Sequence, residues 1–167
     1  MPVDDNWHER ELLKDLAASI VSRKIEIIRN VDPLASRLAE CYPLQSGRID
    51  WRLVDNVREL AATPESTVSD FQLAEPATAL RHFWQEVRRE NSIDDDTTAI
   101  VFGDSLISFL LRLSIDTLTC HLVEILSIPH HTYIFPEDVS WCFNYTMEGN
   151  AFFARRPVRR SDWPQFK

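Results

Sequence analysis

Five cysteine and histidine side chains in the last third of the chain are of types that bind transition metals. They are Cys120, His121, His130, His131 and Cys142. Thiolates and imidazoles suit zinc, but the spacing of these five matches no zinc finger or ribbon. Adjacent helix residues such as Cys120 and His121 diverge by about a hundred degrees, and adjacent residues entering a strand, such as His130 and His131, tend to point two ways. We therefore predict no metal site and no bound cofactor.

A cysteine nucleophile, Cys142, with His131 as its base is the corresponding catalytic hypothesis. The sequence contains no glycine-bracketed elbow of the G-x-S-x-G type, no H-E-x-x-H and no Walker sequence. The three cysteines are too few and too widely spaced for a disulfide framework, and we expect buried, reduced thiols. We therefore predict that the protein is not an enzyme. A small enzyme that uses a Cys/His pair or a carboxylate site remains the alternative.

Carboxylates are the most concentrated chemical group. Asp94, Asp95 and Asp96 could offer oxygen ligands to a divalent cation, but the alternating ligands, central glycine and distal glutamate of an EF-hand are missing. Residues 90–154 carry a net charge of −9, whereas the last thirteen residues carry +4 and the whole chain −8. Such an acidic region repels nucleic acid and anionic lipid and attracts basic partners. We interpret the aspartate run as a solvated loop or as part of a partner-binding surface.

Aromatic residues gather in the same acidic region. They are Tyr133, Phe135, Trp141, Phe143, Tyr145, Phe152 and Phe153. Most of them are expected in the core, but tryptophan and tyrosine dominate binding hot spots when they are exposed. Trp141 and Tyr145 are therefore candidate anchors if their face of the sheet is exposed.

The elements that must position these residues divide the chain in two. Apolar residues at three- and four-residue steps predict a first helix that begins after Asp4 or Asp5 and includes Ile28. Further helices are predicted at 33–40, at 51–62 with Asp50 as cap, and at 77–90, with a turn at Ser46-Gly47 and a loop at 65–74.

The C-terminal part is predicted to carry the strands. Strands are predicted at 97–102, which is β-branched and apolar, and at 132–135, 140–147 and 151–154. In 140–147, aromatic residues alternate with smaller ones. Segment 105–113 is a strand or a helix, and 114–127 is predicted as a helix. The fold class is therefore α+β, with a helix-rich N-terminal part packed on a small antiparallel sheet in the C-terminal part.

The chain is interpreted as one α+β domain over residues 1–154 and a basic tail over residues 155–167, which folds back on the protein's own acids or stays mobile. The N-terminus lacks the features of a signal peptide. The longest apolar stretch, 100–115, is interrupted by Asp104 and Arg112 and is too short for a membrane span. The expectation is a cytoplasmic protein that binds neither membrane nor nucleic acid.

Segment 130–153 reads HHTYIFPEDVSWCFNYTMEGNAFF. It resembles the C-terminal part of some bacterial immunity proteins, which are encoded beside polymorphic toxins, including those of contact-dependent growth inhibition. The similar features are a helix, a Y-I-F-P-x-D strand entry, an S-W-C-F strand and a short acidic hairpin. Together they cover the last third of the chain.

The resemblance implies a non-enzymatic, cytoplasmic inhibitor that binds and occludes one cognate toxin domain. Many such toxins are nucleases with basic grooves, which an acidic surface would block while steering association. Besides Trp141 and Tyr145, the predicted partner contacts are Asp94, Asp95, Asp96, Asp104, Glu137, Asp138 and Glu148. An acidic adaptor domain in a larger assembly is a further alternative, and the oligomeric state is open.

Overall fold

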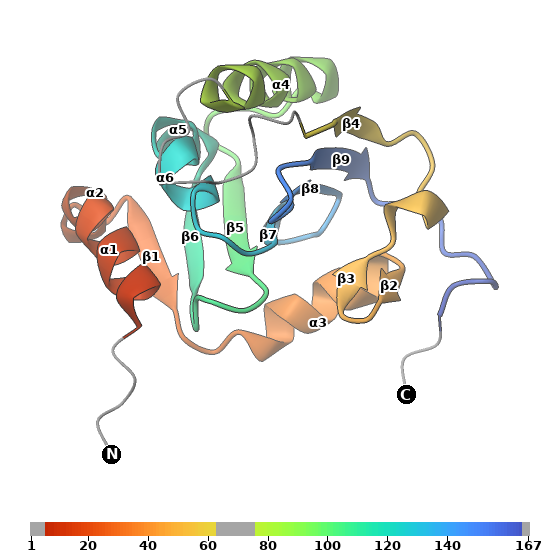
Figure 1. The fold of residues 1–167 in the computed structure, drawn as a ribbon, viewed down its shortest axis with the longest axis horizontal. Helices are drawn as coiled ribbons and strands as arrows, with labels where there is room; N and C mark the ends of the chain where they lie inside the picture. The colour runs from red at the N-terminus through yellow and green to blue at the C-terminus, as the bar shows by residue number, and fades with distance from the viewer. Residues whose placement is uncertain (1–5, 63–75, 165–167) are drawn as a thin grey trace.

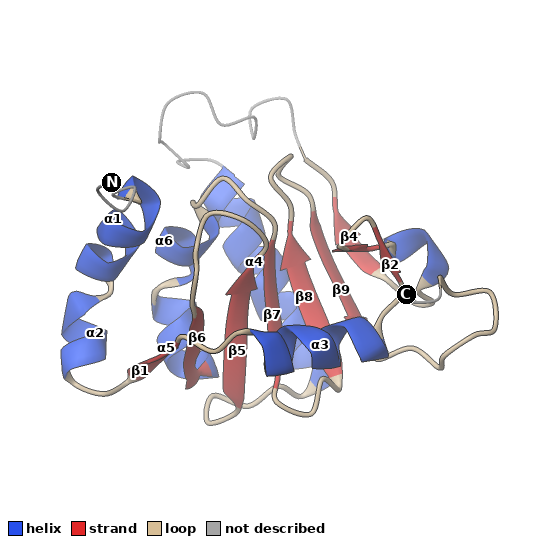
Figure 2. Cartoon of the chain, turned by 90° about the horizontal axis from the view of Figure 1, so that it is seen from below, coloured by secondary structure: helices blue, strands red, loops and turns tan. Residues whose placement is uncertain are grey.

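The computed structural model describes residues 6–62 and 76–164. Within these ranges a seven-stranded antiparallel sheet lies between layers of helices, and a two-stranded sheet packs beside it (Figures 1 and 2). The order of the large sheet is β1-β6-β5-β7-β8-β9-β4. Its strands are β1 (Ile25–Ile28), β4 (Arg58–Leu60), β5 (Thr98–Gly103), β6 (Leu110–Ser114), β7 (Thr132–Pro136), β8 (Trp141–Tyr145) and β9 (Ala151–Arg155), and the small sheet pairs β2 (Leu44–Gln45) with β3 (Arg48–Ile49). The predicted α+β class is confirmed, with most strands in the C-terminal part.

Side-chain caps start two of the α-helices, and the first of them is capped by Asn6 and not by the predicted Asp4 or Asp5. Asn6 caps α1, and its side chain accepts from the amide of Glu9 at 3.3 Å. Ser114 caps α5 in the same way, through the amide of Thr117 at 3.2 Å. The α-helices are α1 (Trp7–Asp15), α2 (Ala17–Val21), α3 (Asp32–Cys41), α4 (Pro76–Asn91), α5 (Ile115–Cys120) and α6 (Leu122–Leu126), and η1 (Trp51–Leu53) is a short 3₁₀-helix. No helix in the described ranges is long and apolar enough to cross a membrane.

Side chains alternate along the central strands, so that each strand contributes to two cores. On one face, Trp141, Phe143 and Tyr145 of β8 pack in the larger core with α1 and α4–α6. On the other face, Cys142 packs in a smaller core with Tyr42 and α3. Figure 2 shows α3 on the opposite side of the sheet from α4. Because both faces are covered, all five residues of β8 are buried.

The second face also contains a buried polar network. The amide oxygen of Asn144 accepts from the Trp51 indole at 3.0 Å, and its nitrogen donates to the Thr132 carbonyl at 3.0 Å. The Tyr42 hydroxyl donates to the Ala154 carbonyl at 2.9 Å. These bonds fasten η1 and the end of α3 to the sheet, since a buried polar group without a partner would cost stability.

Two helix predictions in the N-terminal part are wrong. The first helix does not include Ile28, because α2 ends at Val21, Arg23 adopts a positive φ of 60°, and β1 then pairs with β6. The predicted helix 51–62 is only η1, capped by Asp50 as expected, followed by β4 on the edge of β9. In both segments the sheet supplies a long-range partner that outweighs local helical periodicity.

Several other predictions are confirmed. The helices at 33–40 and 77–90 correspond to α3 and α4, the turn at Ser46-Gly47 joins β2 to β3, and the three C-terminal strands are β7, β8 and β9. Segment 105–113 contains the first four residues of β6 after a loop, and helix 114–127 is divided at His121. The predicted loop at 65–74 lies outside the described residues.

Gly103 and His130 are in close contact at one end of the sheet. A Cβ atom at Gly103 would lie 1.9 Å from Cε1 of the His130 ring. His130 is buried, and its Nδ1 is 3.4 Å from the amide of Leu106. The imidazole of His130 therefore occupies the space that a side chain at position 103 would fill.

We predict that Gly103→Ala destabilises the fold by about 2 kcal/mol, because the new methyl group overpacks against the ring. Chemical denaturation of the purified variant measures this cost. His130→Ala supplies the control background, in which the cost of Gly103→Ala should shrink markedly. Equal costs in both backgrounds would contradict the steric explanation.

Burial lowers the pKa of His130 to about 4, and it also lowers the pKa of His131. In the unfolded chain His130 becomes protonated near pH 6.5, the usual pKa of histidine, whereas in the folded protein it becomes protonated only near pH 4. We therefore predict that stability falls as the pH drops through this window, with His130 contributing about 2 kcal/mol of loss between pH 7 and pH 5.

Urea unfolding at pH 7 and pH 5 tests this prediction in the parent and in His130→Gln. The variant should lose less stability than the parent over this interval, whatever its stability at pH 7. His82→Gln removes an exposed histidine and serves as the matched control. An equal loss in the parent and in His130→Gln would rule out the contribution of His130.

Candidate functional site

Five of the seven predicted contact acids lie at one end of the sheet. Strand β5 begins beside the end of β7, where Ala99 pairs with Pro136. The loop before β5 and the turn after β7 therefore meet, although about forty residues separate them in the sequence. We call the exposed acids of these two segments the acidic rim: Asp94, Asp95, Asp96, Glu137 and Asp138.

Helix α4 fixes the first of these segments. Its Trp84 is completely buried, stands edge-on against Phe143 of β8 with ring centroids 5.2 Å apart, and donates from its indole nitrogen to Thr119 at 3.0 Å. Beyond α4 the chain turns through Ser92, which has a positive φ of 53°, and buries Ile93. The aspartate loop therefore starts from an anchored point.

Backbone hydrogen bonds hold the aspartate loop itself. The Asp94 carbonyl accepts from the amide of Thr97 at 3.1 Å, and the Asp95 carbonyl accepts from the amide of Asp116 at 3.0 Å. The side chains project from a backbone tied to α5, so presenting them to a partner costs little conformational entropy.

The rim carboxylates differ in how far they are neutralised. Asp95 forms an ion pair with Arg88, and Glu137 lies 2.9 Å from Nε of Arg112. Hydrogen bonding by Ser140 lowers the pKa of the Asp138 carboxyl, whose Oδ1 accepts from the Ser140 amide at 3.0 Å. The carboxylates of Asp94 and Asp96 form no ion pair with any residue in the described ranges, which leaves them the most available to a cation.

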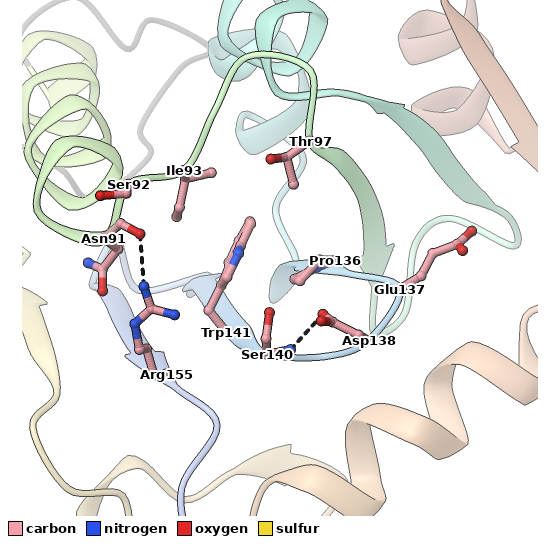
Figure 3. A pocket seen from close by; sticks show the side chains of 10 residues that line it. All are labelled: Asn91, Ser92, Ile93, Thr97, Pro136, Glu137, Asp138, Ser140, Trp141 and Arg155. Carbon is pink, nitrogen blue, oxygen red and sulfur yellow. Dashed lines mark hydrogen bonds between the residues drawn. The ribbon is translucent and has the colours of Figure 1, made fainter.

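A hollow of about 430 Å³ adjoins the rim, and two of the rim acids, Glu137 and Asp138, line it (Figure 3). Trp141 stands in its middle, with Asn91 and Arg155 on one side and the Glu137–Asp138 turn on the other. Nη2 of Arg155 donates to the Asn91 carbonyl at 2.8 Å, which joins the end of β9 to the end of α4. The hollow therefore contains a cation as well as acids.

The other two predicted acids lie at the opposite end of the sheet. Asp104 follows β5, its side chain is only 16% exposed, and it contacts Nε of Arg48 at 3.4 Å and the amide of His131 at 3.1 Å. Glu148 lies in the β8–β9 turn, 3.9 Å from Nε2 of His131. The seven acids therefore do not form one surface, and the contacts of Asp104 are those of a structural residue.

Trp141 and Tyr145 lack the exposed face on which their predicted role as anchors depended. They are only 4% and 6% exposed and belong to the core beneath α4. Trp141 packs near Trp84 and Phe153, with ring centroids 6.3 and 5.9 Å away. Their aromatic rings therefore support the sheet and do not form an open binding face.

Sequence reasoning did not connect the basic tail with this site. Arg155 is the last residue of β9, and Nη1 of Arg156 donates to the carbonyl of Asp138 at 3.2 Å. Arg160 pairs with Asp55, and Trp163 is buried. The part of the tail that the structure describes, up to residue 164, thus folds back on the protein, which was one of the two predicted alternatives. The apolar, aromatic run at 151–154 leads directly into Arg155, and it was the signal that could have shown that the strand reaches this arginine.

The cysteines do not support the Cys/His nucleophile. Cys142 is fully buried, and burial raises the pKa of its thiol, which opposes the thiolate that a nucleophile needs. Cys120 is exposed and Cys41 half-buried, so the expectation that all three are buried is wrong. In the part of the chain that the structure describes, no three or more His, Cys, Asp or Glu side chains are grouped to hold a metal ion.

Comparison with known proteins adds no assignment. No known family model matches the sequence, and no curated protein is significantly similar to it.

We predict that one thiol, Cys120, reacts rapidly with a thiol reagent in the native protein, because it is the exposed one. Cys142 should react only when the protein unfolds, and Cys41 should react slowly. Absorbance after addition of Ellman's reagent measures the phases, and Cys120→Ser should remove the fast one. A fast native reaction of Cys142 would restore the nucleophile hypothesis.

Proposed function

We propose that this chain is a non-enzymatic immunity protein that binds a basic toxin domain and occludes it, with the acidic rim as its main contact. The observation that carries the proposal is the convergence of five exposed carboxylates from two distant segments on one anchored end of the sheet. The resemblance of segment 130–153 to immunity proteins favours the same function.

The charge of the rim suits a partner with a cationic groove, such as a nuclease. Clustered exposed acids raise the rate of encounter with a basic surface, and salt screens this effect. The negative charge of the rim also repels nucleic acid. An inhibitor with this surface would occupy the groove of a nuclease in place of the nucleic acid substrate, and it would not bind that substrate itself.

The proposed location is the bacterial cytoplasm. All three cysteines are free, and one of them, Cys120, is exposed. An exposed free thiol persists in a reducing compartment. An immunity protein must also be present where its toxin acts.

The proposal expects a toxin domain encoded beside this chain, and that domain, produced as a catalytically inactive variant, tests the rim. We predict that Asp94→Asn/Asp96→Asn lowers the association rate about tenfold at low salt, because both carboxylates are exposed and form no ion pair in the described ranges. Stopped-flow fluorescence measures the rate, and the difference from the parent should vanish at high salt.

The charge-matched control is Glu11→Gln/Asp15→Asn, which removes two acids from α1. This helix starts beside Leu106, in the loop at the other end of β5 from the rim, and its Glu11 pairs only with the exposed Lys14 among the described residues. It should bind at nearly the parental rate. If both double variants slow association equally, net charge and not the rim steers the partner. If the neighbouring domain does not bind the parent at all, the immunity function itself is wrong.

A further inference from the structure

A second hollow, of about 660 Å³, adjoins the first and shares Asn91 and Arg155 with it. We call it the arginine hollow because four arginines line it. Its charged lining residues are Arg58, Arg155, Arg156, Arg160, Asp55 and Glu90. They come from β4 and the turn before it, the end of α4, the end of β9 and the tail, so only the folded chain brings them together.

Two of the four arginines are already neutralised. Arg58 pairs with Glu90 and lies 3.8 Å from Glu86, and Arg160 pairs with Asp55. Each acid of the hollow therefore has a cation of its own. The hollow keeps two positive charges in excess.

The remaining two guanidinium groups are held by neutral acceptors. Arg155 donates to the Asn91 carbonyl at 2.8 Å, and Arg156 donates to the Asp138 carbonyl at 3.2 Å and approaches Sγ of Cys41 at 3.8 Å. Arg156 is close enough to lower the pKa of Asp138, but neither arginine forms an ion pair with a carboxylate in the described ranges.

This arrangement suits the recognition of an oxyanion. A guanidinium has five N–H donors in a planar fork. The hydrogen bonds within the described ranges leave most of those donors unused in both arginines. The carbonyl contacts fix the two groups without cancelling their charge. A carboxylate entering the hollow would therefore find donors that are already positioned and that match its two oxygens.

The surroundings limit the kind of anion. The acidic rim adjoins the arginine hollow through Arg155, and Asp55 and Glu90 lie in the hollow itself. An extended polyanion such as nucleic acid would meet these acids along its length. A single compact anionic group meets fewer acids, and the two inside the hollow are already paired with Arg58 and Arg160.

We propose that the arginine hollow receives a single carboxylate side chain, an aspartate or glutamate, from the protein that binds the acidic rim. This proposal rests on the proposed function and deepens it. The partner surface would then carry basic residues opposite the rim and an acidic residue beside them. Such a bipolar pattern fixes the orientation of the partner and rejects proteins that are merely basic.

The test uses the full chain, labelled with ¹⁵N, and the peptide acetyl-Gly-Glu-Gly-amide as the probe. The arginine Nε–Hε signals report binding at each guanidinium during a titration at constant ionic strength. We expect saturable shifts at Arg155 and Arg156 and none with acetyl-Gly-Gln-Gly-amide. Arg156→Gln should weaken binding about tenfold, since it removes a charged hydrogen-bond donor.

Arg159→Gln is the matched control, because Arg159 lies in the same tail but does not line the hollow. It should bind the glutamate peptide as the parent does. Arg155→Gln provides a second variant if Arg156→Gln fails to fold. Inorganic phosphate, titrated in parallel, separates a side-chain carboxylate from a free small anion.

The outcomes are distinct. Equal shifts with the glutamate and glutamine peptides, or shifts spread over all arginines, would overturn the carboxylate site. Much tighter binding of phosphate would assign the hollow to a free anion and overturn the proposed occupant. None of these results bears on the rim, whose role is measured by the salt-dependent association rate, so failure of the hollow and failure of the proposed function can be told apart.

Discussion

The contact of Trp84 with β8 is the interaction on which the candidate site depends. The buried indole packs edge-on against Phe143 and lies close to Trp141, and its nitrogen is satisfied by Thr119. This contact holds α4 across the sheet (Figure 1). The end of α4 is consequently placed beside the end of β9, and the loop that follows is placed beside the β7–β8 turn.

Coverage of both faces of the sheet decides where binding can occur. Helix α4 and its neighbours cover one face and α3 the other, so aromatic strands that would suit an interface are used for packing. The ends of the strands remain exposed and carry the charged loops. At one end the acidic rim and the arginine hollow meet at Arg155, which lies in both hollows. The proposed binding surface is therefore charged, with a negative part and a positive part side by side, and buried aromatic residues pack beneath it.

Much of the C-terminal fold could be predicted because its local signals agree with its tertiary environment. The segments of β7, β8 and β9 have strand composition and are separated by turn residues. Helix α4 begins at Pro76, and proline is favoured in the first turn of a helix. Strands β1 and β4 could not be predicted in the same way. Each is a short edge strand whose hydrogen-bond partner comes from a segment more than eighty residues away. The spacing of their apolar residues also fits a helix, and only the hydrogen bonding to a neighbouring strand shows that these segments are strands.

The sequence by itself determined the α+β class, the concentration of negative charge in residues 90–154 and the positive charge of the tail. It could do so because composition and local periodicity are properties of neighbouring residues. The tertiary structure alone decided that Asp94–Asp96 join Glu137 and Asp138, while Asp104 and Glu148 lie at the other end of the sheet. It also decided that Trp141 and Tyr145 are covered and that the tail's first arginines border the rim. The physical reason is antiparallel pairing, which brings the start of one strand to the end of another regardless of their separation along the chain.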